Sequence, residues 1–352
     1  MGEGIAMPFN NEFLHNASKP VRVQSVEGDF DNAKKLIEKA IKLASERSHF
    51  IDPKEVDIYI HGSYALETNI YFPSNLEIMV ELKKTPDYDP GKTQYKKYRL
   101  YNNYFVDTTC EFNPVDFSKA LYEALAEVTG GNLSQSEKFI ELPRQKGIRH
   151  TLEVTPCFSF NYVEQSIPLR LDADSIAPNF FKDAQTFRGV ILFDHSVGKH
   201  IFTFPKLHAR NGQAKNLATN GNFLKIVRLF KTLNKIGERE LDFDKTRGYF
   251  INCLLFNVPN DLFIVRNFGG AKTNPLIASG YANDDPSLHK IFLRVLNFLL
   301  NTDFENFVSQ NMIWMLFGAA DEFWKIHDAH EFVKDMKELY DNFPIDRKLL
   351  AL

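Results

Sequence analysis

The chain has 352 residues, of which 44% are hydrophobic and 25% are charged, as in ordinary globular proteins. This composition excludes a disordered tail, a collagen-like fibre and a small disulfide scaffold. The formal net charge of −3, from 42 basic and 45 acidic residues, argues against a surface that is basic throughout and coats nucleic acid. The length corresponds to about two domains of roughly 150 residues each.

The cysteines and the apolar segments indicate where such a protein is located. Cys110, Cys157 and Cys253 lie far apart and form no CxxC pair, so neither a zinc knuckle nor a disulfide framework is expected. The N-terminus lacks the basic start and apolar run of a signal peptide. No stretch approaches about 18 consecutive apolar residues, so we expect no transmembrane helix. These features predict a cytoplasmic protein.

The periodicity of the first half predicts a mixture of helices and strands. Residues 1–29 carry few periodic signals and are predicted to form a partly extended arm. A helix is expected at 31–48, with Asp29 or Asp31 at its start. The further predicted elements are strands at 56–60, 76–82, 139–142 and 150–155, a polar loop at 85–103 and a helix at 114–129. Pro156 is expected to end the strand at 150–155.

The second half changes character, because strand signals fade after about Phe204. Apolar residues at helical spacing predict helices at 221–236, 246–257, 287–301, 304–317 and 328–342. A mixed sheet followed by a run of helices is an α+β arrangement. We therefore predict a first lobe at 1–205 that contains the sheet and a mostly helical second lobe at 206–352.

A turn after the first predicted strand carries residues suited to phosphate and metal chemistry. In Gly62-Ser63, the glycine lets the backbone approach a ligand, and the serine hydroxyl and nearby N–H groups can bind phosphate. Alternate residues of a strand point the same way, so Asn75 and Glu77 present two oxygen ligands on one face. Glu153, on a separate strand, can supply a third. Oxygen ligands combined with substrate phosphates are typical of Mg²⁺ sites.

This pattern resembles that of the polymerase-β-type nucleotidyltransferases, and within them the cGAS/DncV-like group that makes cyclic oligonucleotides in bacterial anti-phage defence. The family pattern has a Gly-Ser turn, a Thr five residues after the Ser, an Asp-x-Asp strand and a third Asp shortly before a Pro. The matching positions here are Gly62, Ser63 and Thr68, then Asn75 and Glu77, then Glu153 followed by Pro156. Segments between Phe204 and Pro259 also look like the family, so the resemblance covers roughly residues 30–330.

The resemblance implies a polymerase-β-like core, a helical lobe and a Mg²⁺- or Mn²⁺-dependent enzyme. Such an enzyme joins nucleoside triphosphates into a cyclic di- or oligonucleotide second messenger and releases pyrophosphate. By this resemblance, Asn75, Glu77 and Glu153 would be the catalytic and metal-binding residues, and Gly62, Ser63, Thr68 and Lys231 would bind the nucleotide. An effector protein that reads the product is an implied partner, whereas a membrane or a nucleic acid is not.

Four positions depart from the family pattern and affect the expected activity. Asn75 stands in place of the first Asp, and Glu77 and Glu153 stand in place of the other two. Glutamate is one methylene longer and still ligates a metal, whereas asparagine offers a neutral oxygen and removes one negative charge. Gly248 stands about where a hydroxyl residue that helps bind the triphosphate is expected.

A basic segment lies at 199–239, where nine Lys and Arg residues are opposed only by Glu238. Lys231 falls at the border of the apolar face of the predicted helix, so a phosphate contact and a solvated helix face remain equally open. The other basic residues of the segment, Arg228 among them, are predicted to be solvated.

Two alternative functions remain open at this stage. One is a nucleotidyltransferase that acts on a nucleic-acid end or on a protein, which would need a broad basic surface. The other is a nucleotide-binding pseudoenzyme of the same fold, and Asn75 is the residue that favours it.

Overall fold

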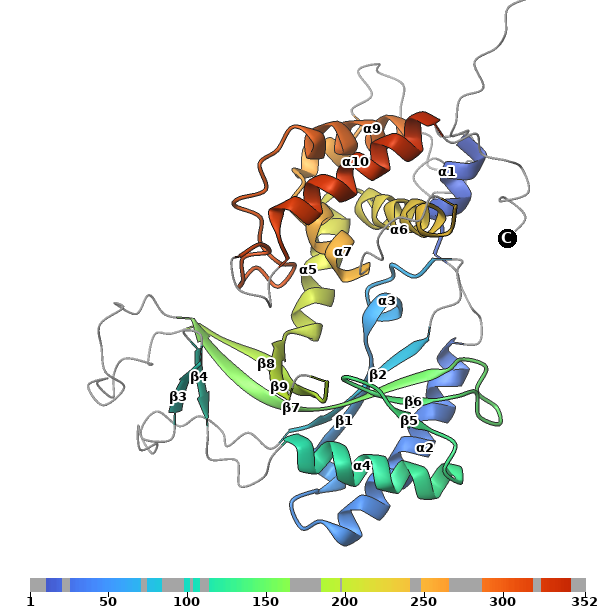
Figure 1. The fold of residues 1–352 in the computed structure, drawn as a ribbon, viewed down its shortest axis with the longest axis vertical. Coiled ribbons are helices and arrows are strands. Elements are labelled where there is room, and N and C mark those ends of the chain that lie inside the picture. The colour runs from blue at the N-terminus through green and yellow to red at the C-terminus, as the bar shows by residue number, and fades with distance from the viewer. Residues whose placement is uncertain are drawn as a thin grey trace, which may run out of the picture. The chain divides into compact units, whose positions relative to one another are not determined.

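The computed structural model of the chain describes residues 11–20, 26–70, 75–83, 98–101, 104–107, 114–164, 185–196, 198–240, 248–265, 287–318 and 324–342. The chain forms two compact units (Figure 1). We call Val23–Gly62 with Asn75–Lys206 the sheet unit, and Met1–Arg22, Ser63–Ser74 and Leu207–Leu352 the helical unit. The helical unit therefore includes two segments from the first half of the chain, in addition to residues of the predicted second lobe.

The sheet unit is built on one seven-stranded mixed sheet with the order β1-β2-β7-β6-β5, in which β8 pairs with β7 and β9 pairs with β8. Its strands are β1 Val56–Ile60, β2 Leu76–Leu82, β5 Ser134–Gln135, β6 Ile140–Leu142, β7 Leu152–Glu164, β8 Gln185–Asp194 and β9 Lys199–Thr203. The pairing of β2 with β7 is parallel, and the other pairings are antiparallel. A separate antiparallel pair consists of β3 Tyr98–Tyr101 and β4 Tyr104–Asp107.

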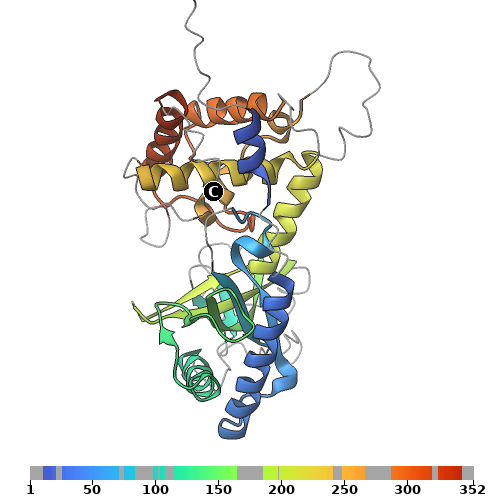
Figure 2. The same ribbon diagram turned by 90° about the vertical axis from the view of Figure 1, so that its right-hand side faces the viewer.

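Two helices cover one face of this sheet, namely α2 (Val26–Arg47) and α4 (Pro114–Thr129), as Figures 1 and 2 show. They pack against each other, and α4 also contacts β7 and β8. The buried residues of α2 recur at the three-and-four spacing of one helical face, from Ala33 through Ile37 to Ala44. A short 3₁₀ turn, η1 (Pro53–Glu55), leads into β1, with the side chain of Asp52 accepting a hydrogen bond from the N–H of Lys54.

The helical unit is a Phe-rich assembly around one long helix. Its helices are α1 Asn11–Ser18, α6 Asn222–Glu240, α7 Gly248–Phe256, α9 Ser287–Leu300 and α10 Ile326–Asn342, with the 3₁₀ turn η5 Asn260–Phe263. The helices α3 (Gly62–Ala65) and α5 (Pro205–Ala218) each begin in the sheet unit and continue into the helical unit. The core surrounds α6, which contacts α1, α7, α9 and α10. Phe230 of α6 packs against Phe292 and Phe332 there.

Several predicted elements differ from the structure at their ends. Residues 11–18 and 26–29 are helical instead of extended, so neither Asp29 nor Asp31 caps a helix start. Strand β7 continues through Pro156 to Glu164. Pro156 lies after Val154, the last residue paired with β6, and before Cys157, the first paired with β8, so its missing N–H breaks no pairing at that edge.

For two segments, the predicted secondary structure is wrong. Tyr98–Tyr101 is a strand within the predicted loop at 85–103, and residues 84–97 and 102–103 lie outside the described part of the chain. The predicted helix at 304–317 is instead a series of turns and bridges. Phe304 and Met312 there adopt φ angles of 64° and 63°, which interrupt a right-handed helix. Within the described ranges, none of the helices combines the length and hydropathy needed to cross a bilayer.

Candidate active site

The turn after β1 is shaped around the carboxylate of Glu77. The N–H of His61 donates to the carbonyl of Glu77 at 2.8 Å, which ties the turn to the start of β2. Gly62 follows with φ +66°, and a Cβ atom at this position would lie 1.9 Å from Oε1 of Glu77. Glycine is therefore needed for two reasons. It adopts the left-handed conformation readily, and the Glu77 carboxylate occupies the space that a side chain would fill.

Pairing of the strands brings three glutamates into one row. Glu77 on β2 is in register with Glu153 on β7, and Glu153 is in register with Glu141 on β6. Side chains in register on adjacent strands point to the same face of a sheet. We call Glu77, Glu153 and Glu141 the acid row. The Nδ2 of Asn75 donates to Oε1 of Glu153 at 2.7 Å, so the structure brings together the three predicted ligands.

Glu141 belongs to this row but was not predicted as a site residue. Its strand was predicted, and its position two residues from Phe139 follows from the alternation of that strand. Its place beside Glu153 depends on which strand pairs with which and in what register. A single sequence contains no direct signal of that register, because pairing partners are far apart along the chain.

The carboxylates of the acid row repel one another when they are ionised. Burial raises the pKa of Glu153, the neighbouring carboxylates of Glu77 and Glu141 raise it further, and the hydrogen bond from Asn75 only partly opposes them. A bound cation would relieve this repulsion. By contrast, burial lowers the pKa of His61 to about 4, so this imidazole is neutral at pH 7.

Three of these side chains, Asn75, Glu77 and Glu153, offer oxygen ligands that a divalent cation could use. Among the described residues, no group of three or more His, Cys, Asp or Glu side chains is arranged to hold a metal ion. Two carboxylates and one amide make an incomplete cage, and Mg²⁺ is commonly held in this way, by one or two carboxylates together with water and substrate phosphates. The residues therefore fit an ion that binds together with a triphosphate.

The helical unit contains the other predicted site residues. The N–H of Thr68 donates to the carbonyl of Ser63 at 2.9 Å, which closes a turn from Ser63 to Thr68. From α6, the Nζ of Lys231 donates to Oγ1 of Thr68 at 2.8 Å and to its carbonyl at 3.4 Å. Lys231 is only 9% exposed, so it does not belong to a solvated helix face. Because the family resemblance implies that Ser63 and Thr68 would bind the nucleotide, we call residues 63–68 the nucleotide-binding turn.

Gly248 lies directly beside this lysine. A Cβ atom at this position would lie 3.2 Å from Cε and 3.3 Å from Nζ of Lys231, which is tighter than ordinary van der Waals contact. Any side chain at position 248 would therefore have to displace the lysine slightly. This contact gives a physical reason for glycine at the position where the family resemblance predicts a hydroxyl residue.

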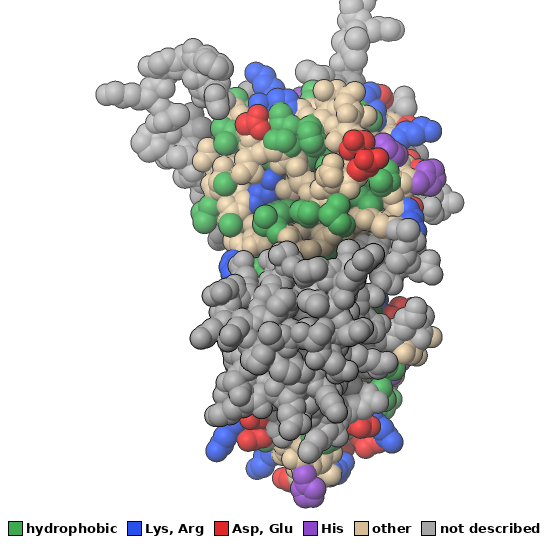
Figure 3. Space-filling view, turned by 90° about the vertical axis from the view of Figure 1, so that its left-hand side faces the viewer, with side chains coloured by type: hydrophobic (Ala, Val, Ile, Leu, Met, Phe, Trp, Pro, Cys, Tyr) green, Lys and Arg blue, Asp and Glu red, His purple; other side chains and the backbone are tan. Residues whose placement is uncertain are grey.

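The basic segment at 199–239 is not one solvated surface. Arg228 is 5% exposed, and burial lowers its pKa to about 10, so the prediction that it is solvated is wrong. The pKa of Lys215 is lowered to about 8 by burial, and its Nζ lies 5.2 Å from the ring centroid of Phe263 and donates to the carbonyl of Val258. On the face drawn in Figure 3, the described Lys and Arg side chains are interspersed with acidic and uncharged ones.

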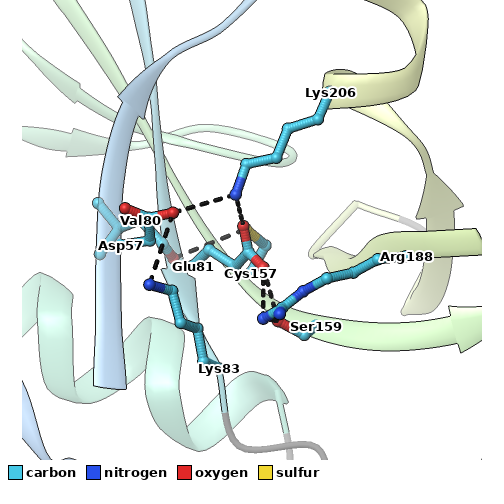
Figure 4. A network of polar contacts seen from close by, with 8 residues as sticks. All are labelled: Asp57, Val80, Glu81, Lys83, Cys157, Ser159, Arg188 and Lys206. Atoms are coloured by element: carbon cyan, nitrogen blue, oxygen red, sulfur yellow. Dashed lines mark hydrogen bonds and ion pairs between the residues drawn. The ribbon is translucent and has the colours of Figure 1, made fainter. Parts of the chain in front are cut away.

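A charged network holds the far end of β2 (Figure 4). Glu81 is 1% exposed and accepts hydrogen bonds from Oγ of Ser159 at 2.6 Å and from Nζ of Lys206 at 2.9 Å. Lys206 also donates to Asp57 at 3.0 Å, and Arg188 lies 3.3 Å from Glu81. Burial opposes ionisation of Glu81, but these partners hold its pKa below the usual value. The network joins β2, whose other end carries Glu77, to the first turn of α5.

Comparisons with known proteins show which proteins the chain is similar to. Residues 210–274 match the family model of the cGAS/DncV-like nucleotidyltransferase C-terminal helical domain. The cyclic nucleotide synthase CdnE01 of Staphylococcus haemolyticus is 27% identical over 333 residues, which cover 93% of this chain and 99% of that protein. The cyclic UMP-AMP synthase of Rhodothermus marinus is 26% identical over 317 residues, which cover 90% of this chain and 94% of that protein.

Solved structures show the same fold. The Rhodothermus marinus CdnE c-UMP-AMP synthase with Apcpp and Upnpp superposes with a TM-score of 0.67 and 22% identity, covering 96% of this chain and 99% of that one. The Elizabethkingia meningoseptica CdnE cyclic dinucleotide synthase with GTP and Apcpp superposes with a TM-score of 0.66 and 20% identity. That match covers 95% of this chain and 99% of that one. The fold is that of a polymerase-β-like nucleotidyltransferase core with a helical lobe. By its fold, its C-terminal helical domain and its relatives along nearly the whole length, the chain is similar to the cGAS/DncV-like nucleotidyltransferases.

Proposed function

We propose that this protein joins nucleoside triphosphates into a cyclic di- or oligonucleotide and releases pyrophosphate. The observation that carries the proposal is the register of Glu77 with Glu153 on adjacent parallel strands, beside a Gly62 turn that leaves room only for the Glu77 carboxylate. The curated relatives named above are cyclic nucleotide synthases, which supports the cyclic nature of the product.

In the proposed reaction, a hydroxyl oxygen of one nucleotide attacks the α-phosphorus of another. A new P–O bond forms, the bond between the α- and β-phosphates breaks, and the pair of electrons leaves with pyrophosphate. Asn75, Glu77 and Glu153 would hold Mg²⁺ or Mn²⁺, which supplies activation of the hydroxyl and neutralises charge on the leaving group. Glu153 would accept the proton of the attacking 3′- or 2′-hydroxyl.

The nucleotide-binding turn would hold the donor triphosphate. Gly62 and Ser63 begin this turn and offer backbone N–H groups and a hydroxyl to phosphate oxygens. Thr68 positions the ammonium of Lys231 through the 2.8 Å hydrogen bond, and a buried ammonium is a strong partner for a triphosphate. Phosphoryl-type transfer depends mainly on positioning and charge neutralisation, so these few groups are enough for the chemistry.

We also propose that the product is a second messenger of anti-phage defence, made in the cytoplasm and read by an effector protein. This part rests on the family resemblance and on the cyclic nucleotide products named for the relatives. It predicts that cells lose protection from phage when Glu77 is replaced by glutamine.

One experiment tests the activity directly. The purified protein is incubated with the four nucleoside triphosphates and Mg²⁺ or Mn²⁺, then treated with phosphatase and measured by mass spectrometry. Phosphatase-resistant cyclic products, absent from a Glu153→Gln control, support the proposal. Linear products or labelled macromolecules would instead indicate a nucleotidyltransferase that acts on a nucleic-acid end or a protein.

A second candidate function is a nucleotide-binding pseudoenzyme, and the hydrogen bond from Asn75 to Glu153 favours it. This bond stabilises the carboxylate without a cation. Asn75→Asp would replace it with repulsion between two carboxylates, so the variant should melt at a lower temperature in chelator. If the site is that of an enzyme, Mg²⁺ with a triphosphate should reverse this loss and raise turnover. A variant that binds nucleotide but stays inactive, like the wild type, would favour the pseudoenzyme.

A further inference from the structure

Arg228 is a buried cation that the sequence motif does not include. It lies on α6 three residues before Lys231, which places the two side chains about one helical turn apart on the same side. Its Nε donates to the carbonyl of Ser18 at 2.5 Å, and its Nη1 donates to the carbonyl of Glu67 at 2.6 Å. Burying a guanidinium is unfavourable, and these charge-assisted hydrogen bonds offset that cost.

The carbonyl of Glu67 belongs to the nucleotide-binding turn at its most strained residue. Glu67 has φ 52°, in the left-handed region that disfavours residues with a Cβ atom. Its own side chain is exposed, and its N–H donates to the carbonyl of Tyr64 at 3.2 Å. The next residue is Thr68, whose carbonyl and hydroxyl oxygens accept from Lys231. Two basic side chains of α6 therefore hold two consecutive carbonyls of one turn.

We propose that Arg228 is a positioning residue for the nucleotide-binding turn. By holding Glu67 in its left-handed conformation, it orients the Thr68 hydroxyl toward Lys231. Through its second hydrogen bond, it ties the C-terminal end of α1 to the same point, where Oγ1 of Thr232 also donates to the carbonyl of Ala17 at 3.4 Å. The inference rests on the proposed role of Lys231 and the turn in binding a triphosphate.

A purely structural role is the alternative, in which Arg228 only fastens α1 to α6. Both roles predict a lower melting temperature when the guanidinium is removed. Only the positioning role predicts weaker nucleotide binding and faster amide hydrogen exchange in residues 63–68. These two measurements therefore decide between the roles.

The test compares Arg228→Met and Arg228→Lys with the control Lys235→Met. Lys235 lies on the same helix but is exposed and paired with Glu238. For Arg228→Met, we expect faster exchange in residues 63–68 and a Kd for a non-hydrolysable nucleoside triphosphate raised about tenfold, the effect of losing one charge-assisted hydrogen bond. For Arg228→Lys, the Kd and the exchange rates should lie between those of the wild type and of Arg228→Met, because one ammonium does not span both carbonyls. This variant provides the test if Arg228→Met does not fold. The control should match the wild type in both measurements.

A second-site change makes the test specific to the backbone of Glu67. In the Arg228→Met background, Glu67→Gly should lower the Kd again, because glycine adopts the left-handed conformation without a Cβ penalty. Glu67→Gln removes the same charge but keeps the Cβ atom, so it should give no recovery. If Arg228→Met lowers only the melting temperature and leaves Kd and exchange unchanged, the inference is wrong. If the wild type binds no triphosphate, the proposed function fails, and the exchange data still decide the role of Arg228.

Discussion

Replacing Gly62 with alanine tests whether Glu77 must lie where the structure places it. The substitution has two separate effects. First, it puts a Cβ atom on a residue with φ +66°, which costs about 1–2 kcal/mol of stability. Second, the new Cβ atom would lie 1.9 Å from Oε1 and 2.1 Å from Cδ of Glu77. The Glu77 carboxyl is the end of a flexible side chain, so it can move away at little further cost in stability.

Such a movement would be costly for the proposed catalysis, because the carboxylate would leave the position from which we expect it to act. A displacement of about 1 Å at a reacting centre can lower the rate roughly 100-fold. We therefore expect Gly62→Ala to lose about two orders of magnitude in kcat/KM. Its melting temperature should fall by only a few degrees, at about 2–4 °C for each kcal/mol in a domain of this size.

Gly130→Ala is the matched control for the stability cost of placing a Cβ atom on a residue with positive φ. Gly130 has φ +71°, and a Cβ atom there would meet nothing within 4 Å. The control should lose a similar amount of thermal stability and keep full activity in the mass-spectrometric assay. If the two variants have equal activity, then the carboxylate of Glu77 is not needed at its observed position, and the assignment of the acid row as the catalytic site is refuted.

Three further predictions follow from the sheet unit. Lys206→Met leaves the buried Glu81 carboxylate without its shortest ion pair, which should cost about 3 kcal/mol in urea unfolding; a loss below 1 kcal/mol would mean that the network is not structural. Burial opposes ionisation of Asp29, yet its hydrogen bonds with His150 and backbone N–H groups hold its pKa below the usual value. The resulting stability is complete above about pH 3.9, the unfolded value, and lost as pH falls through the folded pKa, so Asp29→Asn should flatten the acid limb of the stability profile. The raised pKa of Glu153 has the opposite effect on the pH profile. Its contribution to the stability of the fold is complete below the unfolded pKa of about 4.3 and is lost as pH rises through the folded pKa. Without metal, Glu153→Gln should therefore melt above the wild type at pH 7, with a difference that shrinks toward pH 4.

The fold could be predicted from the sequence where local patterns decide the structure. Strands β1 and β2 and helix α4 lie at the predicted residues, because alternation or helical periodicity is bounded there by clear breaks. The segment at 304–317 shows the limit of this reasoning. Phe304, Phe307 and Phe317 are buried at helical spacing, yet they are buried by turns that pack on the core. Periodicity indicates which residues are buried, but turns that pack on a core can produce the same spacing of buried residues as a helix.

The candidate site divides in a similar way. Gly62, Asn75 and Glu77 could be predicted because they lie within one short stretch of chain, where spacing and strand phase fix their relative directions. Glu141 and Arg228 could not. The first depends on strand register, and the second is buried through carbonyls more than 150 residues away in the sequence. Basic residues on a helix are usually solvated, so the burial of Arg228 requires the three-dimensional contacts.

The charge at the acid row leads to a last prediction, about the order in which ligands bind. Asn75 carries no charge where the family pattern has a carboxylate, so Glu77 and Glu153 are the predicted carboxylate ligands. Two divalent cations beside two carboxylates leave an excess of positive charge that only substrate phosphates offset. Metal affinity should therefore be poor without nucleotide and should rise when a non-hydrolysable triphosphate is present. Linkage requires the converse, so Mg²⁺ should strengthen triphosphate binding by the same factor. Calorimetric titration of Mg²⁺ with and without the analogue measures this coupling, and Glu77→Gln should reduce it. Tight Mg²⁺ binding in the absence of nucleotide would contradict the charge argument, because it would require a third strong ligand, for which Glu141 is the neighbouring carboxylate in the row.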